Sequence, residues 1–104
     1  MAQPPKLTDE QRKAALVRAA EARRVRAEVK ELLKTGSLRI SELFQRADSD
    51  DLLAGLKVES LIASMPGTGK IKAKRMMESL GIAENRRIRG LGDNQKQALI
   101  AEFS

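Results

Sequence analysis

Apolar side chains recur at helical spacing over most of the chain, beginning with one long amphipathic run. On a helical wheel, one stripe of this run contains Ala15, Ala19, Ala22, Val29 and Leu33, with Val25 and Leu32 beside it. Thr8 and Gln11 have the spacing of a capping box, and Gly36 supplies a stop signal. The pattern predicts a helix from about Asp9 to Lys34. Its C-terminal half should dock on a core, and its Ala-rich N-terminal half should project into solvent or fray.

Shorter apolar runs follow at the same spacing. They predict a helix over residues 38–48, with Ile40, Leu43, Phe44 and Ala47 as its apolar side. A turn with a helix N-cap is expected at residues 49–51, followed by helical segments that are interrupted at Gly55 and end before Pro66. Further helices are expected from about Lys70 to Gly81 and from residue 93 to about Phe103, separated by a broken stretch. Because no strand pattern is present, the predicted fold class is all-α.

Charge is unevenly distributed along the 104 residues, whose length suggests one domain. The net charge is +6, from 20 Lys and Arg against 14 Asp and Glu. Residues 1–34 carry +4, residues 35–62 carry −2 and residues 63–104 carry +4. Two basic segments flanking an acidic one favour two contact surfaces for a polyanion over a general solubilising charge.

The absence of Cys and His excludes disulfides, thiol nucleophiles and imidazole chemistry, and we expect neither a metal site nor a cofactor. No apolar run approaches the length of a membrane span. The first residues lack the pattern of a secretory signal, and Pro4 and Pro5 favour a short disordered lead-in. We therefore expect a cytoplasmic protein.

The most informative motif is the Gly-rich turn formed by Pro66, Gly67, Thr68 and Gly69. It is not a Walker A loop, because position 64 is Ser and Ile71 follows Lys70. A dinucleotide fingerprint is also excluded, since Lys72 stands where its third Gly belongs. A Gly-x-Gly turn that opens a helix can still bring backbone N–H groups close to a phosphate at the positive end of the helix dipole.

The helix behind this turn has a basic face. Lys70, Lys72, Lys74 and Arg75 are expected opposite an inward face of Ala73, Met76, Met77 and Leu80. Ile71 falls among the basic residues, and we expect it to tuck under the turn. An ordinary joint between helices with a solvated basic face is the alternative.

Two further basic clusters complete the candidate site. Arg86, Arg87 and Arg89 lie in a non-helical, Gly-bounded stretch, where guanidinium groups suit phosphate oxygens or base edges. A neighbouring sector of the long helix contains Arg12, Arg23, Arg26, Lys30 and Lys34, a possible second DNA surface. Either cluster could instead be a solvated surface.

The string Met65–Lys74, followed by Leu80-Gly81-Ile82 and then residues 86–95, resembles the actinobacterial type of integration host factor. The resemblance extends upstream and covers nearly the whole chain. It implies a long N-terminal helix and a helix–two-turn–helix domain like that of a small-subunit ribosomal protein. We expect three parts: a disordered lead-in (1–8), a long basic helix (9–35) and the DNA-binding domain (36–104).

The function implied by the resemblance is that of a nucleoid-associated protein, which binds duplex DNA with little sequence preference and affects DNA shape. It matches Gly67, Gly69, Lys70 and Lys72 to a phosphate-binding turn and helix, and residues 86, 87 and 89 to the family's Arg set at the DNA. The minor groove is the expected site for these Arg side chains, because its potential is the most negative. We expect a monomer, no membrane partner and no catalytic activity.

The runner-up is a small-subunit ribosomal protein that binds ribosomal RNA through the same domain type. Such proteins usually carry a long basic C-terminal tail, whereas this chain ends at Ser104, and the acidic segment 35–62 fits poorly inside RNA. Base-excision glycosylases also contain the domain, but position 2 is Ala instead of their catalytic Pro. Single-strand binding is disfavoured, because it normally uses exposed aromatic side chains and the chain has only Phe44 and Phe103.

Overall fold

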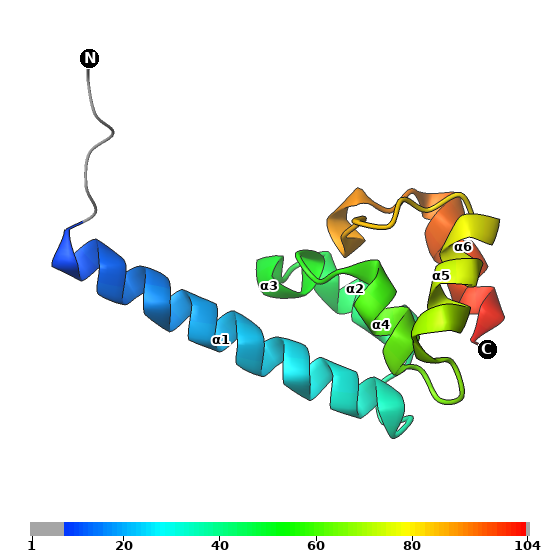
Figure 1. Cartoon of the computed structure of the whole chain (residues 1–104), viewed down its shortest axis with the longest axis horizontal. Helices are drawn as coiled ribbons and strands as arrows, with labels where there is room; N and C mark the ends of the chain where they lie inside the picture. The colour runs from blue at the N-terminus through cyan, green and yellow to red at the C-terminus, as the bar shows by residue number, and fades with distance from the viewer. Residues whose placement is uncertain (1–7, 104) are drawn as a thin grey trace, which may run out of the picture.

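The computed structural model describes residues 8–103 and is helical throughout, as the apolar spacing predicts (Figure 1). Its elements are α1 (Asp9–Lys34), α2 (Ile40–Ala47), α3 (Asp51–Ala54), α4 (Val58–Ser64), α5 (Gly69–Ser79), the 3-10 turn η1 (Ile88–Gly90) and α6 (Asp93–Glu102). Within residues 8–103 there is no strand, only one isolated antiparallel bridge between Lys57 and Arg87. The all-α prediction is confirmed.

Helix α1 is capped as the sequence predicts. The Gln11 N–H donates to Thr8 Oγ1 (3.1 Å), and the Thr8 N–H donates to Gln11 Oε1 (3.0 Å). At the other end Gly36 has φ 77°, and the Leu38 N–H donates to the Leu32 carbonyl (3.1 Å). Both ends of this 26-residue helix are therefore fixed by local chemistry.

Only the C-terminal part of α1 belongs to the core. Val29 and Leu33 are buried and Val25 is half-buried, whereas residues 8–21 are all exposed. Figure 1 shows the N-terminal half of α1 extending away from the other helices, as expected. Leu32, which the wheel places beside this stripe, is 40% exposed. The packing stripe is thus narrower than the wheel suggests.

Helices α2 to α6 surround one apolar core. It is formed by Val29, Leu33, Leu38, Ile40, Leu43, Phe44, Ala47, Leu53, Leu56, Val58, Leu61, Ile62, Ala73, Met77, Ile82, Ile88, Leu91 and Leu99. No polar or charged residue is buried in the described part of the chain. The charged side chains are therefore left on the surface, where they can meet a ligand.

Two predicted boundaries need correction. The helix expected from residue 38 begins at Ile40, because the Leu38 N–H completes the end of α1 and Glu42 accepts from the Arg39 N–H (3.3 Å). The helix expected to end at Gly81 ends at Ser79, because Gly81 has φ 67° and terminates it. The predicted N-cap at residues 49–51 is Asp50, whose Oδ1 accepts from the Leu52 N–H (3.0 Å).

The division into three parts stays a prediction. Of the lead-in predicted over residues 1–8, all but Thr8 lies outside the described residues. None of the helices in the described range is both long and apolar enough for a membrane crossing.

Candidate nucleic-acid interface

The turn between α4 and α5 is a type II β-turn. The Thr68 N–H donates to the Met65 carbonyl (3.1 Å), with Pro66 and Gly67 as the central residues. Pro fits the first central position, and Gly67 has the positive φ (74°) that the second requires. Pro66 also favours the extended backbone of Met65, where α4 stops. The sequence therefore fixes the direction in which the chain enters α5.

The N-terminus of α5 is open to solvent. Gly69 also has φ 74°, and nothing lies within 4 Å of the position that a Cβ would occupy on Gly67 or Gly69. No side chain caps α5, and its first turn contains no acidic residue. Helix α1, in contrast, has Thr8 as a cap and two acidic residues in its first turn. The free N–H groups and the positive end of the α5 dipole therefore face an accessible space that suits an anion.

Two lysines of α1 face this turn. Lys30 and Lys34, one turn apart on α1, line a cleft whose opposite wall includes residues 63–69. Lys30 is half-buried and Lys34 is exposed, and Glu31, between them on α1, also lines the cleft. The cleft joins part of the predicted second surface to the Gly-rich turn.

A second cleft lies on the other side of the contact between α1 and α4. Its basic side chains are Arg26 and Lys30 from α1, Lys57 before α4, and Arg87. Arg87 is placed here by the bridge, in which the Val58 N–H donates to the Arg86 carbonyl and the Ile88 N–H to the Leu56 carbonyl (both 3.0 Å). Because Lys30 lines both clefts, they adjoin, and together they are here called the α1–α4 surface. It is basic on balance, because five cationic residues and one acidic residue, Glu31, line it.

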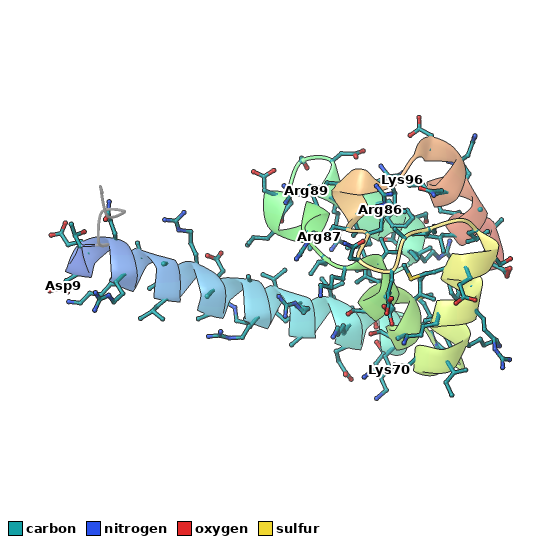
Figure 2. The ribbon with its side chains drawn as sticks, turned by 45° about the horizontal axis from the view of Figure 1, so that its top comes forward. Asp9, Lys70, Arg86, Arg87, Arg89 and Lys96 are labelled. Carbon is teal, nitrogen blue, oxygen red and sulfur yellow. The ribbon has the colours of Figure 1, made fainter. Side chains whose placement is uncertain are left out.

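The three Arg side chains of the loop before α6 are exposed, and each also bonds a backbone carbonyl. Arg86 donates to Gly90 (3.3 Å), Arg87 to Gly55 (2.5 Å) and Arg89 to Asp51 (3.4 Å). A guanidinium has five N–H donors, so each side chain keeps donors for a ligand. Figure 2 shows the three gathered at one side of the domain, with Lys70 at a distance from them. The turn and the Arg cluster are therefore separate contact points.

The structure leaves some predicted residues apart from the α1–α4 surface. Lys74 Nζ lies 3.8 Å from Glu84 Oε1, and Lys74 lines a cleft that also contains Glu59 and Glu78. These carboxylates weaken the attraction of Lys74 for an anion. Arg12 and Arg23 are both exposed on α1 and line neither cleft. The expectation that Ile71 tucks under the turn is wrong, because 73% of it is exposed.

Two residues that line the second cleft escaped the sequence interpretation. Lys57 and Ser60 line the second cleft. Lys57 stands alone as a basic residue between Arg46 and Lys70, so no cluster drew attention to it. Lys96, on α6, was also passed over; its Nζ lies 3.9 Å from Asp48 Oδ1, and its side chain is only 24% exposed. These positions depend on tertiary contacts that spacing alone does not reveal.

The helices and clefts define a helix–two-turn–helix protein with a basic surface. Residues 33–103 match the family model of the S13-like H2TH domain. Among curated proteins, the chain is 52% identical over 103 residues to an integration host factor of Streptomyces coelicolor, covering 99% of this chain and 95% of the relative. It is 50% identical over 99 residues to that of Mycobacterium tuberculosis, covering 95% and 94%.

A solved structure of sIHF bound to an 8-base-pair palindromic DNA superposes with a TM-score of 0.81 at 47% identity, over 84% of this chain and 98% of that one. This chain belongs to the actinobacterial integration host factor family. The resemblance stated from the sequence motifs is thereby confirmed.

Proposed function

We propose that this protein is a nucleoid-associated architectural protein that binds duplex DNA with little sequence preference. The observation that carries the proposal is the meeting of an uncapped α5 N-terminus with the basic α1–α4 surface at Lys30. Shared ancestry with integration host factors, and a similar protein solved with DNA, support DNA as the polyanion.

Backbone phosphates are the first class of contact in this proposal. One phosphate accepts N–H bonds at the turn of Pro66 to Gly69, and Lys70 and Lys72 continue the contact along the strand. Lys30 and Lys34 neutralise the same region from the opposite wall of the cleft. These contacts fix the position of the protein without reading sequence, because every nucleotide presents the same phosphate.

The minor groove is the second class of contact. Arg86, Arg87 and Arg89 reach into or across it, where the negative potential favours guanidinium groups. Contacts at two separated points on one rigid domain favour a duplex that is bent or reshaped, which assists recombination, replication or transcription. Arg12 and Arg23, the N-terminal members of the basic sector of α1, offer a further contact on a longer duplex.

The proposal places a monomer in the cytoplasm, at the nucleoid, and includes no catalytic step. The charged side chains at both contact points are Lys and Arg, and the chain contains neither His nor Cys to act as a general base or nucleophile at neutral pH.

The test is fluorescence-anisotropy binding to a random-sequence duplex DNA and to a structured RNA of equal length, across a salt series. If about six phosphates are neutralised, the log–log slope of affinity against salt should be near −5. The variant Arg86→Ala/Arg87→Ala/Arg89→Ala should lose affinity and flatten the slope. Urea denaturation of each variant shows whether the domain still folds, since these side chains also bond backbone carbonyls.

The matched control is Lys13→Ala/Arg18→Ala/Arg24→Ala, which removes the same charge from exposed positions of α1 outside the basic sector. It should retain most of the affinity. A slope near −1, or equal losses in the two triple variants, would contradict the proposal. Tighter binding to the RNA would favour the ribosomal alternative.

A further inference from the structure

Ile71 is the most exposed large apolar side chain in the described part of the chain, at 73%. Helix α5 packs through Ala73 and Met77 and makes no use of Ile71 in the core. A single exposed apolar residue is ordinary on a protein surface. Its position, rather than its exposure alone, makes Ile71 unusual.

Ile71 occupies the first turn of α5, between Lys70 and Lys72 and one turn before Arg75. All three cationic side chains are exposed. In a helix each Cα–Cβ bond tilts toward the N-terminus. The side chain of Ile71 therefore leans toward the Gly-rich turn that ends at Gly69. An exposed apolar group therefore lies in the same helical turn as the N–H groups proposed to bind a phosphate, with a cationic residue on either side of it in the sequence.

Cationic side chains and an aliphatic group placed together match the chemistry of a nucleic-acid groove. Phosphates form its rims, and the deoxyribose and base edges between them present apolar surface. Architectural proteins that bind the minor groove use aliphatic wedges there to unstack base steps and bend the duplex. Because Ile is β-branched, its χ1 angle is nearly fixed in a helix, and little rotamer entropy is lost on contact.

We propose that Ile71 enters the minor groove beside the phosphate held at the turn, contacts the deoxyribose and base edges, and sets the bend of the DNA. This inference rests on the proposed function and adds a residue that acts by shape instead of charge. It predicts that the electrostatic and apolar parts of binding can be separated by mutation.

The test compares native protein with Ile71→Ala by anisotropy over a salt series and by the end-to-end energy transfer of a doubly labelled duplex. Losing most of the apolar contact should weaken binding by about tenfold at every salt concentration. The slope against salt should stay at the native value, because no charge is removed. The bend in the saturated complex should decrease.

The matched control is Val17→Ala, which truncates another β-branched residue, 66% exposed, on the projecting half of α1. It should match native protein in affinity and bend. An Ile71→Ala variant that equals the control in both would overturn this inference and leave the proposed function standing. A native complex with unbent DNA would overturn this inference together with the proposed bending, and leave the proposed binding to duplex DNA standing. Failure of native protein to bind duplex DNA would instead overturn the proposed function, and this inference with it.

Discussion

The Gly-rich turn can be tested by adding one methyl group at Gly69. Its φ of 74° lies in the left-handed region, which costs an L-residue about 1–2 kcal/mol. Nothing lies within 4 Å of the added Cβ, so a steric clash contributes nothing in the free protein. Lower entropy of the unfolded chain offsets part of the strain. Gly69→Ala should therefore reduce the free energy of unfolding by about 1 kcal/mol, roughly 4–8 °C in Tm.

The expected loss of DNA affinity from the same change is larger. The methyl group occupies the open space through which a phosphate would approach the N–H groups of α5. Each lost hydrogen bond to a charged group costs about 1.5–3 kcal/mol. One lost bond therefore weakens binding by about tenfold or more. Anisotropy with duplex DNA at one salt concentration, paired with urea denaturation, measures both quantities.

Gly36 supplies the control for this experiment. Its φ is 77°, a Cβ there also meets nothing within 4 Å, and it lies at the end of α1. Gly36→Ala should cost a similar stability and leave DNA affinity near the native value. If both variants lost the same affinity, backbone strain alone would explain the result, and the phosphate site at the turn would be refuted.

Three further changes test other parts of the molecule. Lys30→Ala should reduce the magnitude of the log–log slope of affinity against salt by about 0.9 if Lys30 neutralises one phosphate. Lys13→Ala, on the outer side of α1, should leave that slope unchanged. Equal slopes for the two variants would remove Lys30 from the interface. Leu33→Ala, at a fully buried position, should cost about 2–5 kcal/mol in urea denaturation, and a cost below 1 kcal/mol would show that α1 is not part of the core. Thr8→Ala should destabilise the start of α1 by about 1 kcal/mol and lower helical circular dichroism, with the urea midpoint of the core unchanged; a shifted midpoint would contradict the separation of the two regions.

Much of the fold could be predicted because local signals and burial agree. The bounds of α1 followed from its capping box and Gly36, and all four apolar residues named for α2 are buried. The errors at Leu38 and Gly81 arose because backbone groups there complete a preceding helix instead of beginning or continuing one. Periodicity describes side chains and does not account for backbone hydrogen bonds.

The candidate site was only partly predictable. The Gly-rich turn and the Arg cluster each have a local signature, so the sequence identified both. The sequence does not show that Lys30 of α1 lines one cleft with the turn and another with Arg87 and Lys57. Both placements depend on how α1 packs against α4. At Lys74 the helical pattern shows only a basic face, whereas the fold brings the carboxylate of Glu84 to 3.8 Å from its ammonium group; the predicted DNA contact of Lys74 stays a prediction.

The exposed first half of α1 divides the molecule into two regions of different local stability. Residues 9–21 are helical and all exposed, and isolated helices of about this length are marginal in water. Amide hydrogen exchange should therefore be fast there and slow around Leu33 and Ile62, because local opening needs far less free energy than global unfolding. Thermal melts followed by circular dichroism should show a sloping early loss before the cooperative transition. A single two-state fit would misjudge the stability of the core.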